Sequence, residues 1–356
     1  MMPASEQNRP LHIAMIAPPW LDVPPRGYGG IEEVVAGLVN GLAERGHEVT
    51  LIGAGHTTLP ARFLCTYPNP PSGRIGDPLP DLLHAARALR MLADLDADIV
   101  HDHSLAGPLT ARGRGVPTVV TCHAASHGEL GACYRELGED ISLVAISNAQ
   151  RERAPDLNWV ATVHNALDVD SFPFREDKED WVLWLGRFNP CKGPHLAIDA
   201  ARAAGHHIVL AGKLSEPPEH ACFEEYVRPK LGSDATYVGE ADAELKRELL
   251  AAARCLVFPI QWEEPFGMVM IEAMACGTPV VAFGRGAVPE IVVDGRTGFV
   301  VRTAAELPAA IEAAGRLDPA ACRERVERHF SLGAMTAAYE EVYRRVLATP
   351  GEHVLD

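Results

Sequence analysis

Apolar and polar positions alternate along the chain in blocks that predict strands and helices in turn. Residues 31–42 form the first clear block, because their apolar side chains recur three and four positions apart and make one stripe of a helix. Apolar runs at 11–17 and 48–52 flank this helix and are typical of buried strands. A strand, a helix and a strand in this order predict a βαβ unit, and therefore a parallel sheet.

The alternation continues through the first half of the chain. Further short strands are expected at 99–100, 118–121 and 143–146, and they end near His101, His123 and Ser147. Ligands of open α/β sheets collect at the carboxyl ends of the strands. Residues at these ends are therefore candidates for a binding site.

A second run of strands follows a proline-containing and charge-dense stretch at 170–180, which predicts a linker. Its strands are expected at 181–185, 207–211, 236–238, 256–259 and 279–283, with helices between them. The terminal segment 333–347 is predicted to be one more helix. The pattern thus predicts an α/β protein with two doubly wound parallel sheets, facing across a cleft where a small molecule would bind.

Length and composition agree with a globular protein of this kind. The 356 residues suggest two domains, and a hydrophobic content of 47% is enough for ordinary cores. No apolar run approaches the roughly 18 residues of a membrane span, and the opening MMPASEQNRP lacks the apolar centre of a secretory signal. A cytoplasmic location is therefore expected.

Charge and cysteine usage exclude several classes of function. The net charge of −16 argues against a nucleic-acid footprint and against docking on anionic lipid, since both need a concentrated basic face. Eight cysteines are scattered without a C-x-x-C pair, which indicates reduced thiols in place of a disulfide framework or a zinc site. The oligomeric state is left open.

The stretch 263–281 carries the most informative pattern of the chain. An apolar run at 255–260 predicts a buried strand, which is followed by a loop containing Glu264 and by a helix opened at Pro265-Phe266-Gly267. A helix that begins at a glycine just past a strand presents free N–H groups and a partial positive charge, as a phosphate requires. This helix start is therefore a predicted anion site, at which Phe266, Gly267 and Met268 would bind the phosphate-bearing substrate.

Two carboxylates bracket this anion site. Glu264 and Glu272 are eight residues apart, and a helical rise of about 1.5 Å per residue would separate them by about 12 Å. That span would let one carboxylate reach a sugar and the other a ribose, with a diphosphate between them.

Other candidates allow a functional and a structural interpretation. Arg187 and Lys192, five apart in GRFNPCKG, could close on a diphosphate or could be solvated surface cations. Gly29 and Gly30 precede a helix and could admit a ligand to bare backbone, or could be turn glycines. They do not form a dinucleotide fingerprint, because G-x-G-x-x-G fails at Glu32. A lone histidine such as His123 is more often structural.

Two clusters contain residue types that commonly bind metal ions. Asp168-Val169-Asp170 has the D-x-D form of metal-dependent sugar transferases, and His101-Asp102-His103 offers three ligand types in a row. The second marks the end of a predicted strand, which is a simpler explanation for it. We expect no catalytic metal.

The ordered motifs resemble those of glycosyltransferase family 4, retaining sugar-nucleotide enzymes of GT-B fold. The resemblance covers nearly the whole chain and rests on the E-x7-E pair at 264 and 272 together with the segments 27–30, 121–123, 146–147, 165–168, 186–193, 288–292 and 294–300. It implies a Rossmann-like acceptor-binding domain at 1–168, a Rossmann-like nucleotide-sugar-binding domain at 169–330, and a helix at 331–356 that returns to the first domain. In the segment 165–168, Ala166 stands where the family usually has glycine. The match of this segment to the family's linker also explains Asp168-Val169-Asp170 without a metal.

The resemblance also implies roles for individual residues. Arg187 and Lys192 would neutralise the leaving nucleoside diphosphate without a metal, and His123 would hydrogen-bond the donor sugar. Glu264 would hold sugar hydroxyls, Glu272 would hold the ribose diol, and no cofactor is expected beyond a UDP- or GDP-linked donor. A GT-B epimerase or hydrolase acting on nucleotide sugars, and a binding module with a dead site, remain alternatives.

Overall fold

The computed structural model describes residues 9–27 and 29–348, which divide into two units. Unit 2 is continuous, from Leu167 to Ser331, and unit 1 combines the chain before it with the C-terminal segment after it. The boundaries expected at 168/169 and 330/331 thus lie within two residues of the observed division. Residues 1–8, which contain most of the segment used to judge a secretory signal, and Tyr28 of the glycine motif lie outside the described residues.

Unit 1 is built on seven parallel strands in the order β3-β2-β1-β4-β5-β6-β7. The strand order reverses between β1 and β4, which makes this the topological switch point of the sheet. The strands are β1 (His12–Ile16), β2 (Glu48–Ala54), β3 (Arg62–Tyr67), β4 (Ile99–Asp102), β5 (Thr118–Cys122), β6 (Ser142–Ala145) and β7 (Trp159–Thr162). The helices of eight residues or more are α1 (Gly30–Glu44), α2 (Pro78–Leu92), α3 (Gly128–Leu137) and α12 (Leu332–Ala348), and α4 (Asn148–Glu152) is shorter.

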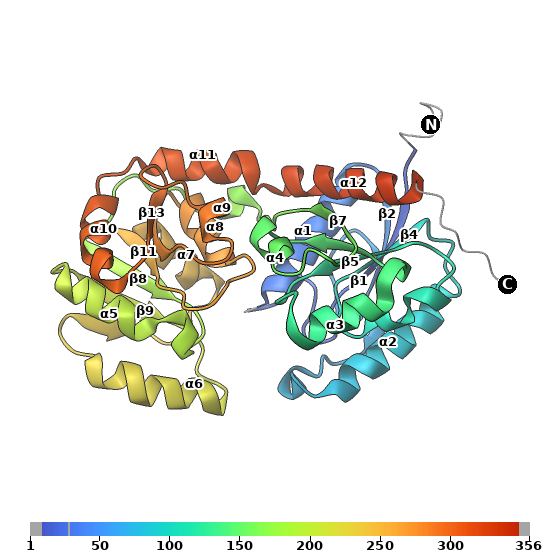
Figure 1. Cartoon of the computed structure of the whole chain (residues 1–356), viewed down its shortest axis with the longest axis horizontal. Helices are drawn as coiled ribbons and strands as arrows, with labels where there is room; N and C mark the ends of the chain where they lie inside the picture. Colours follow the sequence, from blue (N-terminus) through green and yellow to red (C-terminus); the bar gives the residue numbers. More distant parts are fainter. Residues whose placement is uncertain (1–8, 28, 349–356) are drawn as a thin grey trace. The chain divides into compact units, whose positions relative to one another are not determined.

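Helices cover both faces of this sheet, with α12 on one face and α2 on the other (Figure 1). Alternate side chains of β1, such as Ala14 and Ile16, pack with Ala88 and Leu92 of α2. The helix α12 packs against α1 at very short range. A Cβ atom added at Gly41 would lie 2.2 Å from the Thr336 hydroxyl oxygen, so only glycine permits this approach of the two helices.

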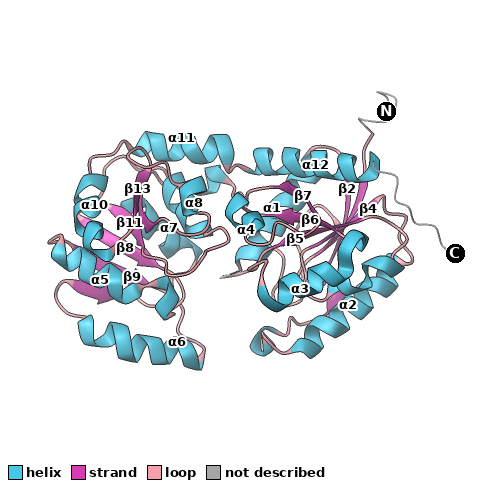
Figure 2. Cartoon of the chain, in the orientation of Figure 1, coloured by secondary structure: helices cyan, strands magenta, loops and turns pink. Residues whose placement is uncertain are grey.

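Unit 2 is built on six parallel strands in the order β10-β9-β8-β11-β12-β13, with its switch point between β8 and β11. The strands are β8 (Trp181–Leu185), β9 (His207–Ala211), β10 (Ala235–Tyr237), β11 (Cys255–Phe258), β12 (Val280–Phe283) and β13 (Gly298–Val301). The helices are α5 (Pro194–Ala203), α6 (Pro217–Cys222), α7 (Ala243–Ala252), α8 (Met268–Ala275), α9 (Val288–Ile291), α10 (Leu307–Ala314) and α11 (Pro319–His329). Figure 2 shows this alternation of helix and strand in each unit.

The core of unit 2 follows from strands that are buried on both faces, as parallel sheets require. Val182 and Trp184 of β8 pack with Ile198 of α5 and Ile311 of α10 on one face. The neighbouring Leu183 is also buried. The apolar runs in the sequence are therefore continuous, and they do not alternate with polar residues.

The predicted fold class is confirmed: an α/β protein with two doubly wound parallel sheets, whose last helix belongs to the first unit. Three strands were not predicted, namely β3, β7 and β13, and all three are sheet edges. Edge strands are covered on fewer sides, so their side chains are less buried and less uniformly apolar. Among the described residues, no helix is both long enough and apolar enough to cross a bilayer.

Candidate functional site

Three of the four predicted charged residues of unit 2 lie in two loops at its switch point, and the fourth, Glu272, lies on a helix. Arg187 and Lys192 follow β8, and Glu264 follows β11. Because β8 and β11 are neighbouring parallel strands, both loops leave the same edge of the sheet. The structure thus brings together residues that are more than 70 positions apart in the sequence.

Backbone contacts hold these two loops at a fixed separation. The Gln261 N–H donates to the Cys191 carbonyl oxygen at 2.7 Å. Gly193 has a left-handed φ of 66°, and a Cβ atom there would lie 2.4 Å from the Pro259 carbonyl oxygen. Both the conformation and the close approach therefore require glycine at this position.

Lys192 and Glu264 form the centre of the site. The Lys192 Nζ lies 2.5 Å from Glu264 Oε2, and the Trp262 Nε1–H donates to the same oxygen at 3.1 Å. The ammonium also lies 5.3 Å from the centroid of the Trp262 ring, within the range of a cation–π contact. The side chains of Lys192 and Glu264 are 24% and 11% exposed, so the pair is largely buried but is still reached by solvent.

A turn after β12 fixes the backbone of Glu264. The Ala287 N–H donates to the Glu264 carbonyl oxygen at 2.9 Å. Gly286, with φ of 53°, approaches that oxygen so closely that a Cβ atom would lie only 2.2 Å from it. Sequence reasoning missed Gly286, whose one signal is its place between a predicted strand and the segment 288–292.

Arg187 is paired within unit 2. Its guanidinium donates to Glu219 Oε1 at 2.8 Å and to Glu216 Oε2 at 2.9 Å. Burial acts to raise the pKa of Glu219, but hydrogen bonds from the Ser215 N–H and from Arg187 outweigh it and hold the pKa below its usual value. These partners were missed, because the capping box from Glu216 to Glu219 has Glu at the N-cap, where the sequence signature expects Ser, Thr, Asp or Asn.

The predicted anion site at the start of a helix is present as α8. This helix begins at Met268, with Gly267 as its N-cap in the left-handed region at φ 87°, and no side chain caps it. The Met270 N–H donates to the Gly267 carbonyl oxygen at 3.0 Å, so the N–H groups of Met268 and Val269 are the ones left for a ligand in the described part of the chain. The predicted 12 Å spacing between Glu264 and Glu272 assumed a continuous helix, and this assumption was wrong. Glu264 lies in the loop before α8, so the helical rise applies only from Met268 onward.

Glu272 and Phe266 differ in how they are placed. Glu272, on α8, receives the Lys246 Nζ from α7 at 2.8 Å, and its side chain is 14% exposed. Sequence reasoning missed Lys246. The Phe266 ring is buried and lies edge-on to Phe330, with the ring centroids 6.0 Å apart. Its side chain therefore belongs to the core, and the predicted donor contact would have to involve its backbone.

In unit 1, the predicted glycines lie between β1 and α1. Gly29 is the N-cap of α1, which has no side-chain cap. A Cβ atom at Gly29 would lie 2.7 Å from Pro25 Cβ, whereas one at Gly30 would meet nothing within 4 Å. Gly29 is thus required by packing of the loop, and Gly30 leaves open space at the start of the helix.

His123 directly follows β5 and belongs to a group of three histidines. Its Nε2 lies 2.8 Å from Nδ1 of His103, which directly follows β4. Nδ1 of His101 lies 2.8 Å from the Tyr343 hydroxyl, and its Nε2 lies 2.7 Å from the Thr121 hydroxyl. Burial lowers the pKa of His123 to about 4 and the pKa of His101 and His103 well below the usual value, so the three rings are neutral at pH 7.

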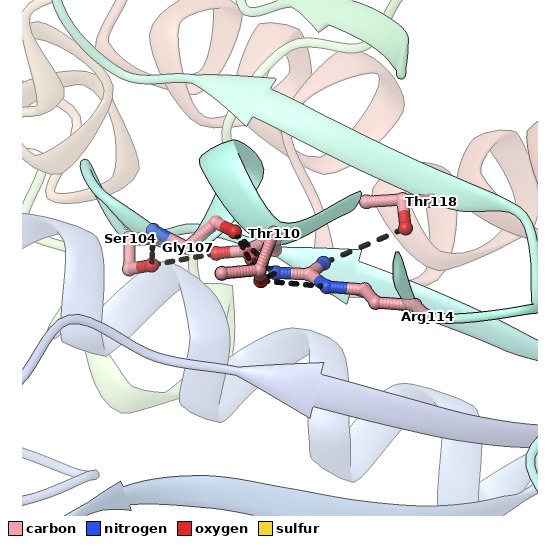
Figure 3. A network of polar contacts seen from close by, with 6 residues as sticks. Ser104, Gly107, Thr110, Arg114 and Thr118 are labelled. Carbon is pink, nitrogen blue, oxygen red and sulfur yellow. Dashed lines mark hydrogen bonds and ion pairs between the residues drawn. The ribbon is translucent and has the colours of Figure 1, made fainter. Parts of the chain in front are cut away.

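The cluster His101-Asp102-His103 is explained by packing within unit 1. Asp102 is fully buried and pairs with Arg114 at 2.7 Å, and it also accepts from the Ser104 hydroxyl at 2.7 Å. Figure 3 shows Arg114 extended along Gly107 and Thr110 in this network. Asp170 instead lies exposed and pairs with Arg323. Within residues 9–27 and 29–348, no group of three histidine, cysteine or acidic residues is arranged to hold a metal ion.

Comparison with known families and proteins gives a consistent result. Residues 169–320 match the family described as glycosyl transferases group 1, and residues 28–171 match the one described as glycosyltransferase family 4. The chain is 31% identical over 342 residues to alpha-maltose-1-phosphate synthase of Mycolicibacterium smegmatis, covering 77% of this chain and 88% of that protein.

Two solved structures resemble nearly the whole chain. The first is a glycosyltransferase involved in avilamycin A biosynthesis, with a TM-score of 0.74 and 29% identity over 96% of this chain and 99% of that one. The second is the sucrose-phosphate synthase of Thermosynechococcus elongatus, with a TM-score of 0.77 and 22% identity over 95% of this chain and 99% of that one. The second likeness concerns the fold alone.

Proposed function

Because the chain belongs to glycosyltransferase family 4, we propose that it transfers a sugar from a nucleoside diphosphate sugar to an acceptor hydroxyl, with retention of configuration and without a metal ion. The GT-B fold that the sequence motifs implied is confirmed by the likeness to solved structures. Glycosyl transfer is the activity of the family. The donor, the stereochemistry and the absence of a metal are the parts that we propose.

The Lys192–Glu264 pair is the observation that supports the donor most directly. A sugar nucleotide carries hydroxyl groups on one side of its anomeric oxygen and phosphate oxygens on the other. An ammonium held 2.5 Å from a carboxylate offers a partner to each side, because Lys192 donates to phosphate while Glu264 accepts from hydroxyls. We assign these two roles to the pair.

The leaving group needs charge stabilisation as the glycosidic bond breaks. Negative charge then grows on the phosphate while the sugar takes on oxocarbenium character. Lys192, Arg187 and the uncapped N–H groups at Met268 would meet this charge. Arg187 has five N–H donors, so it can bind a phosphate oxygen while it keeps part of its contact with Glu216 and Glu219.

Glu272 is proposed to accept from the two ribose hydroxyls of the nucleotide. Lys246 would hold the carboxylate in place through its 2.8 Å contact with Oε1, which leaves Oε2 for the ligand. Gly267 and the backbone of Phe266 complete the proposed donor site. We propose UDP- or GDP-linked sugars as the donors.

Unit 1 is proposed to contribute to the sugar and to the acceptor. Gly30 leaves open space at the N-terminus of α1, with Gly29 before it as the N-cap. His123 is assigned a hydrogen bond to a hydroxyl of the donor sugar.

The test is a transfer assay with the purified protein. Nucleoside diphosphate sugars would first be screened by thermal shift, and the best donor would then be incubated with acceptor pools in excess EDTA. We expect a glycosylated product whose anomeric configuration, measured by NMR, equals that of the donor.

Three outcomes would contradict parts of the proposal. An inverted product would overturn retention, and activity that EDTA abolishes and magnesium or manganese restores would overturn metal independence. Donor turnover that is equally fast without an acceptor would favour a nucleotide-sugar hydrolase or epimerase in place of a transferase.

A further inference from the structure

His103 is a buried residue that the proposed function does not yet use. It directly follows β4, and its backbone N–H donates to the Ile16 carbonyl oxygen of β1 at 2.9 Å. Since β4 and β5 are neighbouring parallel strands, His103 and His123 leave the same edge of the sheet side by side. Their rings are stacked, with centroids 5.1 Å apart.

The contact between the two rings uses one nitrogen of each. His103 Nδ1 and His123 Nε2 are 2.8 Å apart, so one of them donates and the other accepts. This contact occupies Nε2 of His123. Its other nitrogen, Nδ1, has no hydrogen-bond partner in the part of the chain that the structure describes. Nδ1 is therefore the atom of His123 that is left for a ligand.

The contact also couples the tautomers of the two rings. A neutral imidazole carries one proton, so a ring that donates through one nitrogen must accept through the other. If His103 donates, His123 is protonated at Nδ1 and presents a donor; if His123 donates, its Nδ1 presents an acceptor. The second nitrogen of His103, Nε2, is buried and has no partner among the described residues. Because a buried N–H without an acceptor is costly, His103 is expected to keep its proton on Nδ1 and to donate it to His123 Nε2.

We propose that His103 is a positioning residue that holds His123 with Nδ1 available to the donor sugar and sets whether that nitrogen donates or accepts. This inference rests on the proposed function for its consequence in catalysis. The coupling of the two rings is a property of the protein without ligands. It can therefore be tested separately.

The experiment compares three variants of the full chain with the wild type. His103→Leu removes the partner of His123, and His103→Asn keeps a short polar group near the position of Nδ1. Tyr343→Phe is the matched control, because it removes a buried hydrogen bond to His101 and leaves the contact between His103 and His123 intact. Histidine ring nitrogens would be observed by 15N NMR, with His123 assigned from the signals lost in His123→Ala.

We expect one fixed tautomer of His123 in the wild type and in Tyr343→Phe, and averaged nitrogen signals in His103→Leu. A wild-type His123 that is already averaged, or one that His103→Leu leaves unchanged, would overturn the proposal. These signals do not depend on whether the protein transfers a sugar, so they remain informative if the proposed function fails.

Kinetics give the second measurement. His103→Leu should lower kcat/KM for the sugar nucleotide by about 3- to 10-fold, the effect of one lost neutral hydrogen bond. The Kd of the sugar-free nucleoside diphosphate should stay within about twofold, because His123 is assigned to the sugar, and His103→Asn should recover part of the loss. Equal weakening of sugar nucleotide and bare diphosphate would indicate a general structural role and would overturn the assignment.

Discussion

Unit 1 and unit 2 each bring a cation and a carboxylate together at the switch point of a parallel sheet, in opposite environments. Asp102 ends β4 and pairs with Arg114, and the two side chains are 0% and 1% exposed. Lys192 and Glu264 follow β8 and β11, and they are 24% and 11% exposed. The first pair is sealed from solvent inside its unit, and the second is partly exposed to solvent.

The number of additional hydrogen bonds separates the two pairs further. Arg114 also donates to the Gly107 carbonyl and the Thr110 hydroxyl, and Asp102 accepts from the Ser104 N–H and hydroxyl. A buried pair needs such satisfaction, because it has lost its contact with water. Among the described residues, the Lys192 ammonium has one hydrogen-bond partner, Glu264, so its other donors can turn to a ligand. Burial and satisfaction thus distinguish a structural pair from one suited to binding.

Removing one member of each pair tests this distinction and should give the largest effect. Arg114→Met leaves Asp102 buried without compensation, which should lower the free energy of unfolding by about 3 to 5 kcal/mol. Lys192→Met should cost about 1 kcal/mol, because its partner is reached by solvent and retains the Trp262 contact. Urea unfolding, with hydrogen exchange to assign the loss to a unit, measures both. Similar losses in the two variants would show that the pairs do not differ as described.

Substitution of the carboxylates of unit 2 should change ligand binding and turnover. The expected free-energy changes are smaller than the loss of stability expected for Arg114→Met. Glu264→Gln should raise the free-energy barrier to turnover of the sugar nucleotide by about 1.5 to 3 kcal/mol. It should leave binding of the bare diphosphate nearly intact. Glu272→Gln should weaken the bare diphosphate, since its assigned partner is the ribose. Calorimetry and initial rates separate these effects. The same loss of diphosphate affinity in both variants would contradict the division of roles.

The smallest expected effect concerns Asp81, on α2 of unit 1. Burial, aided by the charge of Asp102, raises the pKa of Asp81 to about 6, and its Oδ1 has no partner in the described part of the chain. Because the folded-state pKa is raised, its contribution to stability is full below pH 4 and is lost as the pH rises through 6.

Asp81→Asn should therefore raise stability at pH 8 by about 1 to 2 kcal/mol and change it little at pH 4. Thermal melts at the two pH values measure the difference. Glu48→Gln is a suitable control, because Glu48 is an exposed carboxylate of the same unit. A gain of equal size at both pH values would show that burial of the charge is not the cause.

The same contrast between the units explains what could be predicted from the sequence. Central strands such as β8 and β9 were predicted with their observed bounds, because burial on both faces makes them continuous apolar runs. The charged residues of unit 2 were found because glycines and carboxylates at short spacing are readable locally. The edge strands β3, β7 and β13 lacked such a signal.

Partners that are distant in the sequence could not be found in this way. Lys192 meets Glu264 across 72 positions, and His101 meets Tyr343 across 242. Each contact depends on strand order and register, which periodicity does not determine. The pairing of His103 with His123 is a further example, since both were recognised as ends of strands but their adjacency required the order of β4 and β5.

The helix α12 has a consequence for how the protein is made. Unit 2 is continuous, whereas unit 1 is complete only with α12, whose Tyr339 and Tyr343 reach Thr121 and His101. A ribosome that has polymerised residue 331 has supplied all of unit 2 but none of this helix. The part of the chain that is synthesised first is therefore the last to acquire its full core, and unit 2 can finish folding while unit 1 still waits for its closing segment.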